Sequence, residues 1–252
     1  LNGMELGSHT GGYLPFSFDI TACLKEGENT VAVCVRDESD ASYHSRGKQK
    51  RKRGGIWYTP QSGIWQTVWC ESVPADYIAA LRITPLFDES SVEICAYPQD
   101  AECTLPCVVR IGDVVQHGMA GTPVTVSMEG FKPWSPESPY LYDCEVRMGE
   151  DCVKSYFGMR KFGVEQDEVG APRLFLNGKP YFHTGVLDQG YWPDGLYTAP
   201  SDEAMISDIA AMKELGFNML RKHIKVEPLR WYYHCDRLGM LVWQDMPNGG
   251  GK

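Results

Sequence analysis

Residues 201–243 read SDEAMISDIAAMKELGFNMLRKHIKVEPLRWYYHCDRLGMLVW, and this stretch decides the fold class of the last part of the chain. Apolar side chains recur in its first half every three or four positions, as on one face of an amphipathic helix: Met205, Ile209 and Met212. Ser201 is a favoured residue at a helix N-terminus, and Gly216 is a favoured residue just past a helix end. The spacing therefore predicts a helix over residues 201–215.

Strand-like runs lie on both sides of this helix, at residues 181–187 and 217–220. A second helix begins at Pro228, and residues 240–243 form a third short apolar run. Alternating strands and helices with short links are typical of a parallel α/β arrangement. We therefore assign residues 163–252 to an α/β domain.

Residues 76–162 have a different pattern. Short runs rich in β-branched and aromatic residues follow one another without a helical repeat, at residues 78–84, 91–97, 107–111, 122–128, 140–147 and 154–157. This spacing predicts an all-β sandwich close to an immunoglobulin domain in size. Prolines on both sides of Trp134 indicate a rigid connector there rather than a strand.

Residues 1–75 also alternate β-type runs with turn residues. The run TVAVCV at residues 30–35 is dense in β-branched side chains, and IWQTVWCE at residues 64–71 alternates apolar with polar positions. The dipeptide Asn2-Gly3 is a strong hairpin signal. We therefore predict another β domain. The chain starts inside a strand-like run and ends on a glycine-rich run, so we expect a longer protein around it.

Composition restricts the classes of function. The 252-residue chain has a formal net charge of -9 and a pI near 5.2, which argues against nucleic acid as a partner. The sequence shows no membrane-spanning run, phosphate-binding loop or metal-ligand cluster, so we expect no membrane partner, cofactor or metal. Nine cysteines without a CxxC pair favour buried free thiols and a reducing, cytoplasmic compartment, because most lie among apolar residues, such as Cys23, Cys34, Cys70, Cys95 and Cys144.

A basic segment, RGKQKRKR at residues 46–53, interrupts the first β domain. No aromatic residue interleaves with its basic side chains, so we interpret it as a solvated surface loop rather than a nucleic-acid site. Trp57 and Tyr58 follow directly, and Trp65 and Trp69 lie in the next run. Such rings suit the apolar faces of sugars, and packing in a core explains Trp65 and Trp69 equally well.

Motifs along nearly the whole chain occur in one order: GGYLPFSFD and SGIWQTVW at residues 11–19 and 62–69, PWSPESPYLY and FGMR at residues 133–142 and 157–160, and FLNGKP and LGFNMLR at residues 175–180 and 215–221. They resemble signatures of glycoside hydrolase family two, the β-galactosidase, β-glucuronidase and β-mannosidase group. The resemblance implies part of a sugar-binding jelly roll at residues 1–75, an immunoglobulin-like sandwich at 76–162 and the first three β/α units of a TIM barrel at 163–252.

The resemblance also implies a chemistry. Family members hydrolyse O-glycosidic bonds of β-linked sugars by a retaining mechanism, in which two carboxyl groups lie about 5–5.5 Å apart. In the family both are glutamates that follow the fourth and seventh barrel strands, the first within an Asn-Glu pair. No Asn-Glu dipeptide occurs in this chain. We therefore expect a β-galactosidase-like fragment with carbohydrate as its partner, both catalytic glutamates outside the chain, and no activity of its own.

The substrate-binding residues that the resemblance implies lie where the three barrel strands end, since TIM barrels place function at that edge. They follow the three strands in turn: Asp188 and Gln189, then Arg221 and His223, then Trp243, Gln244 and Asp245. The loop after the first strand adds Tyr191, Trp192 and Asp194. Carboxylates and amides suit sugars because they share hydrogen bonds with paired hydroxyls.

Three of these residues also have a structural interpretation. Arg221 suits an ion pair inside the barrel as well as a substrate contact, and His223 suits a structural histidine equally well. Trp243 suits packing at the barrel end. Asp245 is the strongest candidate for substrate binding, because it directly follows a hydrophobic strand.

Two further hypotheses stay open. The chain could be a stand-alone carbohydrate-binding module, although the open edges of a partial barrel argue against that. It could also be a complete small hydrolase using Asp188 and Asp245, which would require three β/α units to close a site. The run GVLDQ at residues 185–189 departs from the galactosidase pattern, and LVWQD at residues 241–245 is more similar to the mannosidase branch, so the sugar stays open.

Overall fold

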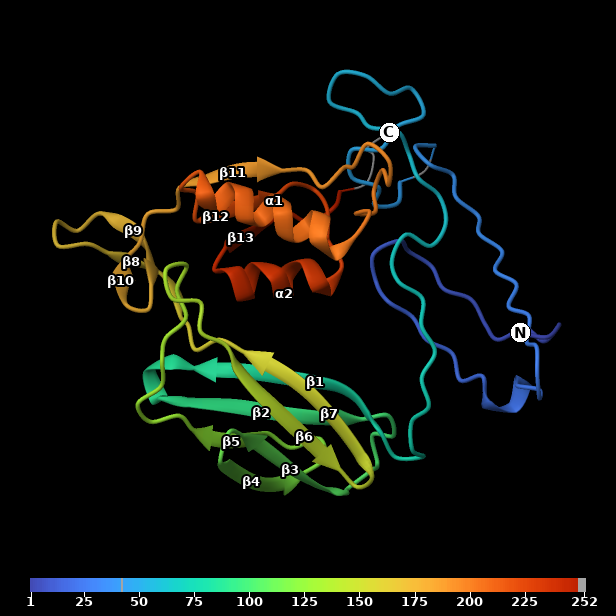
Figure 1. The fold of residues 1–252 in the computed structure, drawn as a ribbon, viewed down its shortest axis with the longest axis horizontal. Helices are drawn as coiled ribbons and strands as arrows, with labels where there is room; N and C mark the ends of the chain where they lie inside the picture. The colour runs from blue at the N-terminus through green and yellow to red at the C-terminus, as the bar shows by residue number, and fades with distance from the viewer. Residues whose placement is uncertain (42, 249–252) are drawn as a thin grey trace.

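The computed structural model describes residues 1–41 and 43–248, which form three parts along the chain (Figure 1). A largely extended N-terminal segment, drawn in blue, runs beside two compact parts. These are a β-sandwich, drawn mainly in green, and a smaller α/β unit, drawn in orange and red. Within the described residues, no helix is both long and apolar enough to cross a membrane.

Seven strands in two antiparallel sheets form the sandwich. One sheet has the order β1–β2–β5 (Ile78–Leu86, Ser91–Pro98, Val124–Ser127), and the other has the order β4–β3–β6–β7 (Val114–Met119, Pro106–Ile111, Tyr142–Met148, Asp151–Phe157). Successive side chains of a strand point to opposite faces, so alternate residues of both sheets fill the core between them. The core residues that are at most 1% exposed include Val92, Ile94, Val109, Val126 and Val146.

Sequence reasoning finds six of these seven strands and misses β4. β4 lies at the edge of its sheet, and almost all of its side chains are exposed. An edge strand held by backbone bonds to one neighbour has no buried face, so its sequence shows no two-residue apolar period.

A small antiparallel sheet connects the sandwich to the α/β unit. It contains β8 (Phe162–Gln166), β9 (Pro172–Leu176) and β10 (Lys179–Pro180). Asn177 and Gly178, at φ 54° and 75°, make the tight turn between β9 and β10 that this dipeptide favours. The three strands of this sheet were not predicted from the sequence, because most of their side chains are exposed.

The α/β unit alternates strands and helices as expected: β11 (Gly185–Asp188), α1 (Asp202–Glu214), β12 (Met219–Lys222), α2 (Leu229–Leu238) and β13 (Leu241–Gln244). The three strands pair in parallel in chain order. Ser201 Oγ accepts a hydrogen bond from the Ala204 N–H at 3.2 Å, which caps α1. Gly239, at φ 77°, ends α2. The first strand was predicted at residues 181–187, but β11 begins only at Gly185, so residues 181–184 lie before the strand.

The two faces of this parallel sheet have different surroundings. On one face, which we call the helix face, a row of apolar side chains packs against both helices: Val186, Leu220 and Val242. On the other, which we call the open face, the next residues in register are Leu187, Arg221 and Trp243. There Leu187 is 48% exposed and Trp243 is 45% exposed. Side chains that follow one another along each strand therefore enter opposite environments.

The strands predicted in the N-terminal segment are wrong for the described residues. Residues 30–35 and 64–71 lie in no strand, and the regular element there is a short 3-10 helix at Thr21–Cys23. Val31 and Val33 are 67% and 60% exposed. β-branched residues favour strands only where another strand pairs the backbone and covers one face, and no described segment does so here. Asn2 and Gly3 make the expected turn, with φ of 54° and 85°, but no strands flank it.

The cysteine prediction is partly wrong. All nine cysteines are free, as expected, but Cys34 and Cys70 are exposed rather than buried. Both lie in the extended N-terminal segment, where no sheet covers the side chains. Cys95, Cys107 and Cys144 are buried in the sandwich.

A polar cluster around Trp134 fastens the sandwich to α2. The Trp134 ring is fully buried, and its Nε1–H donates to the carbonyl of Asp236 at 2.7 Å. Arg160 stacks on the same ring, 4.4 Å from its centroid, and pairs with the Asp236 carboxylate at 2.6 Å. Tyr156 donates to that carboxylate at 3.2 Å. The proline-rich connector predicted around Trp134 is thus the point where the two folded parts meet.

Replacing Asp236 by alanine should lower the free energy of unfolding by about 2–3 kcal/mol, because Arg160 would lose its partner at a site largely closed to water. Urea unfolding of the wild type and the variant measures this loss. Glu38→Ala is the matched control, since it removes the partner of Arg36 in an exposed pair of 2.7 Å. That control should cost under about 1 kcal/mol. Equal costs for the two variants would contradict a clamp at Asp236.

Candidate functional site

The carboxyl ends of β11, β12 and β13 form one edge of the parallel sheet. Asp188, Lys222 and Gln244 lie side by side in register at that edge. Polar residues that follow three parallel strands therefore converge, as the sequence predicts. The polar side chains at this edge point to two different sides of the sheet, some to the helix face and some to the open face.

On the open face, Asp245 holds Arg221 with two contacts. Arg221 Nη2 lies 2.9 Å from Asp245 Oδ2, and Arg221 Nε donates to Asp245 Oδ1 at 3.1 Å. His223 Nε2 lies 3.8 Å from Asp245 Oδ2. Water reaches the pair, since the side chains of Arg221 and Asp245 are 47% and 26% exposed. We call these three residues the Arg–His–Asp group.

His223 is neutral within this group at neutral pH. Burial lowers its pKa, the positive charge of Lys48 lowers it further, and Asp245 opposes both effects. Its Nδ1 has no hydrogen-bond partner among the described residues.

Trp243 lies on the same open face. Its Nε1–H donates to His183 Nδ1 at 2.9 Å, so Nδ1 carries no proton and the neutral tautomer of His183 is protonated at Nε2. Burial lowers the pKa of His183, which favours this neutral form. The bond fixes the orientation of the indole ring while leaving Trp243 45% exposed. A fixed, exposed ring is suited to packing against the apolar face of a sugar.

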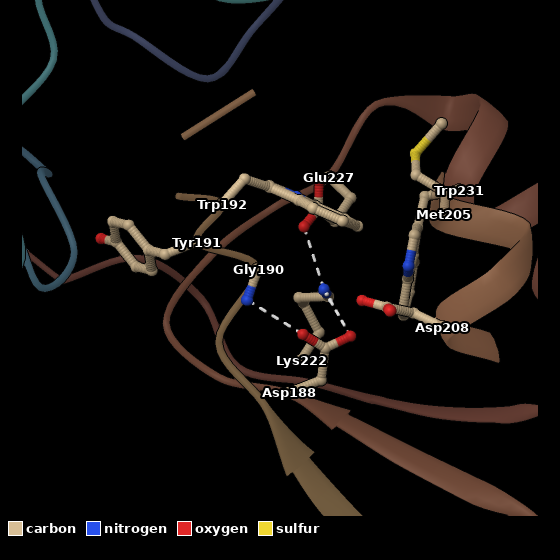
Figure 2. A pocket seen from close by; sticks show the side chains of 9 residues that line it. All are labelled: Asp188, Gly190, Tyr191, Trp192, Met205, Asp208, Lys222, Glu227 and Trp231. Carbon is tan, nitrogen blue, oxygen red and sulfur yellow. Dashed lines mark hydrogen bonds and ion pairs between the residues drawn. The ribbon is translucent and has the colours of Figure 1, made fainter. Parts of the chain in front are cut away.

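On the helix face, the sheet edge carries a buried charge cluster (Figure 2). Lys222 Nζ lies 2.8 Å from Asp188 Oδ2 and 2.9 Å from Glu227 Oε1, and Lys225 Nζ lies 3.0 Å from the same Glu227 oxygen. The side chains of Lys222, Lys225 and Glu227 are 1%, 0% and 3% exposed. Charges removed from water in this way must be paired to be tolerated.

Lys225 fastens the β11–α1 loop, residues 189–201, to the sheet edge. Its Nζ donates to the carbonyl oxygens of Gly190 at 2.5 Å and Tyr197 at 2.7 Å. It also lies 4.4 Å from the Tyr197 ring centroid and 5.5 Å from that of Trp65, a residue of the N-terminal segment. Burial lowers the pKa of Lys225. One buried ammonium thus joins the loop, β12 and the N-terminal segment.

The buried charge cluster was not predicted. Lys222, Lys225 and Glu227 lie in the run RKHIKVEP, which reads as an ordinary charged strand end. The one sequence signal is position: Lys222 falls two residues after Leu220, on the face that packs against helices. Only that alternation distinguishes it from Arg221, which lies on the open face.

Three predicted residues of the strand ends remain. Gln244 belongs to the helix face: its Oε1 accepts from the Tyr232 hydroxyl at 2.5 Å, and its Nε2 donates to the carbonyl oxygens of Lys225 and Asp245 at 2.7 Å each. Asp188 pairs with Lys222 and accepts from the Gly190 N–H at 2.9 Å. Gln189 Oε1 is buried without a hydrogen-bond partner among the described residues.

The β11–α1 loop carries the other three residues named from the sequence. Tyr191 stacks on Tyr58 at 3.8 Å between centroids. Trp192 packs against the apolar cluster between the helices. Asp194 accepts a hydrogen bond from the neighbouring Gly195 N–H. None of these contacts joins the loop side chains to the Arg–His–Asp group.

The aromatic residues of the N-terminal segment have separate environments. Trp65 packs on Tyr197, and Tyr58 on Tyr191, so both cover the β11–α1 loop. Trp57 lies under the ammonium of Lys50 at 4.2 Å, and Trp69 is 69% exposed. Core packing therefore explains Trp65 but not Trp69.

Two pockets beside the helices of the α/β unit are too small for a sugar. Asp188, Asp208, Lys222 and Glu227 line one of about 50 Å³ (Figure 2), and a second of about 160 Å³ lies beside Arg160 and α2. Pockets for small organic ligands usually measure about 300–1,000 Å³. In residues 1–41 and 43–248, no group of three or more His, Cys, Asp or Glu side chains is arranged to hold a metal ion.

Comparisons with known proteins match part of the sandwich in one case and nearly the whole chain in others. The model of the family described as glycosyl hydrolases family 2 matches residues 106–160. A β-galactosidase from Lactococcus lactis is 28% identical over 97% of this chain and 24% of its own length. A crystal structure of a β-glucuronidase from Bacteroides uniformis superposes with a TM-score of 0.73 and 27% identity, over 98% of this chain and 32% of that one.

The chain is related to the family 2 glycosyl hydrolases. This relationship confirms the resemblance found in the sequence motifs. A putative β-glucuronidase from Formosa agariphila is 27% identical over 98% of this chain and 31% of its own length. The chain thus spans about a quarter to a third of the length of these relatives.

Replacing Glu227 by glutamine should destabilise the protein by about 3 kcal/mol, because two buried ammonium groups would share an uncharged amide. Glutamine keeps the shape of glutamate, so the loss measures charge rather than packing. Urea unfolding of Glu227→Gln measures this loss. Glu214→Gln, at an exposed position at the end of α1, is the control for the replacement of glutamate by glutamine itself. A cost near zero for both would show that Glu227 does not hold the cluster together.

One buried and two half-buried histidines should make the protein less stable in mild acid. Burial lowers the pKa of His183, His223 and His234, so the unfolded chain binds protons at these positions more readily than the folded protein. The contribution of these neutral imidazoles to the free energy of unfolding is fully present above about pH 6.5, the ordinary histidine pKa. It is lost as the pH falls below that value.

Urea unfolding between about pH 7.5 and 5.5 measures this loss, which is about 1.4 kcal/mol for each unit of lowered pKa. His234→Gln should reduce the pH dependence. His9→Gln, at an exposed position, should leave it unchanged. A wild-type stability that stays constant over this range would contradict the prediction.

Proposed function

We propose that this chain supplies part of the sugar-binding site of a retaining β-glycosidase. The observation that carries the proposal is the Arg–His–Asp group beside Trp243, on the open face where three parallel strands end. Relatives named β-galactosidase and β-glucuronidase, which act on β-linked sugars, support the same class of substrate. The β-linked glycoside would lie against this face, with Trp243 packing on its apolar side.

We further propose the domain organisation that the resemblance implies. Residues 1–75 would belong to a jelly roll, residues 76–162 to an immunoglobulin-like sandwich and residues 163–252 to the first three β/α units of a TIM barrel. The two-sheet core around Val146 supports the second assignment, and the parallel order β11–β12–β13 with intervening helices supports the third. In such a barrel the open face would be the interior.

The acids at this edge are suited to binding rather than to bond cleavage. A retaining mechanism needs one carboxyl to protonate the leaving group and another to attack the sugar. Asp188 pairs with Lys222, and Asp245 with Arg221. Each carboxylate is thus already held by a cation of the protein, and neither is left free to act on a glycosidic bond. This disfavours a complete small hydrolase using these two aspartates, and we propose that both catalytic glutamates lie outside the 252 residues.

Asp245→Asn tests the proposed site in the complete gene product. If Asp245 holds a sugar hydroxyl through a charge-assisted hydrogen bond, kcat/KM for a nitrophenyl β-glycoside should fall about 10–100-fold. The melting temperature should change little, because the pair with Arg221 is partly exposed to water. Asp113→Asn, at an exposed position in the turn between β3 and β4, is the control and should leave turnover unchanged.

Other outcomes would decide between the alternatives. A variant that keeps its turnover but melts several degrees lower would assign Asp245 to a structural ion pair. Turnover by the 252-residue chain alone, lost in Asp188→Asn or Asp245→Asn, would show that the external glutamates are not needed. Sugar binding without any turnover by the complete gene product would favour a carbohydrate-binding module.

A further inference from the structure

The basic segment of the N-terminal part begins with a turn that lies directly on the sheet edge. The N–H groups of Arg46 and Gly47 both donate to the carbonyl of Asn248, at 3.2 Å, just beyond β13. Gly47 has φ 62°, and a Cβ at this position would lie 2.7 Å from the carbonyl oxygen of Ile224, just beyond β12. The backbone therefore approaches as closely as it does only because residue 47 is glycine.

The residues after the turn are held in place by hydrogen bonds. Gln49 is buried, its Nε2 donates to the Arg46 carbonyl at 2.9 Å, and its Oε1 accepts from the Gln61 N–H at 2.8 Å. The Tyr58 N–H donates to the Lys48 carbonyl at 2.8 Å. Lys48 thus projects from a fixed backbone rather than from a mobile loop. The prediction of a wholly solvated loop is wrong for Arg46, Gly47 and Gln49, which are buried against the sheet edge.

Lys48 is a half-buried cation without a carboxylate partner in the described residues. Its charge nevertheless acts on His223 and contributes to the lowered pKa of that imidazole. Lys222 and Lys225, the other lysines at this edge, are both paired with Glu227. Among the three, only Lys48 has a charge that no acidic side chain of the described chain balances.

The charge balance of the open face follows from these contacts. Asp245 neutralises Arg221, and His223 is uncharged at neutral pH. Lys48 therefore adds a positive charge beside the Arg–His–Asp group. A neutral sugar gains nothing from such a charge, whereas a carboxylate forms a charge-assisted bond with it, about twice as strong as a neutral hydrogen bond.

We propose that Lys48 is a specificity-determining residue of this site and that it binds the carboxylate of an acidic sugar. The proposal rests on the proposed function, because it assigns a substrate class to the same open face. The cation comes from the N-terminal segment, so the acidic sugar would contact two parts of the chain at once. The turn at Gly47 brings this charge to the carboxyl ends of β12 and β13.

Turnover in the complete gene product tests the substrate class. The measured quantity is the ratio of kcat/KM for a nitrophenyl β-glucuronide or β-galacturonide to that for the matching β-glucoside or β-galactoside. Lys48→Met should lower this ratio about 10–100-fold, which is the usual contribution of a hydrogen bond to a charged group. Lys48→Arg should recover part of it, because the charge is kept. Lys52→Met, at an exposed position in the same basic segment, should leave it unchanged.

A ratio that Lys48→Met does not change would overturn the proposal, as would an equal fall for acidic and neutral glycosides. Binding keeps the test independent of turnover. In calorimetry, glucuronate should bind the wild type more tightly than glucose, and Lys48→Met should remove the difference. If the complete gene product hydrolyses no glycoside, the proposed function fails, and the calorimetry still decides the role of Lys48.

Discussion

The structure at the sheet edge depends on one buried carboxylate. Glu227 accepts contacts from Lys222 and Lys225, and these two ammonium groups in turn hold the end of β11, through Asp188, and the β11–α1 loop, through its carbonyl oxygens. Each charge is tolerated away from water only because the others are present. The positions of β11, β12 and the loop are therefore set together. Trp65 and Tyr197 extend this arrangement to the N-terminal segment, since both rings lie over Lys225.

This cluster explains why some polar residues at the edge are available to a ligand and others are not. Asp188 and Gln244 lie on the helix face, where their polar atoms are used within the protein. Arg221, Trp243 and Asp245 lie on the open face, where water reaches them. A strand alternates its side chains between two faces, so neighbouring residues such as Arg221 and Lys222 have unrelated roles. A rigid helix face then presents the open face in a defined geometry, which suits a binding site.

The position of the α/β unit relative to the sandwich rests on a second charged contact. Asp236 of α2 receives Arg160 and Tyr156 from the sandwich side, and its carbonyl receives the indole N–H of the fully buried Trp134. Aromatic burial, an ion pair and two hydrogen bonds act at one place. Residues far apart in the chain, 134 and 236, thereby become neighbours. Through this contact the sandwich is attached to the α/β unit, and through Lys225 the N-terminal segment contacts the edge of the same parallel sheet.

The sequence by itself determined the elements whose signals are local. Ser201 and Gly216 mark the ends of α1, the alternation around Val146 marks a sandwich strand, and the family motifs identify the relatives. It also named the residues of the Arg–His–Asp group. Only the tertiary structure decided that Asp188 pairs with the buried Lys222, that residues 30–35 form no strand, and that the turn at Gly47 lies against the sheet edge. The physical reason is that burial, strand pairing and charge balance depend on partners distant in the chain, which a local pattern of residues does not specify.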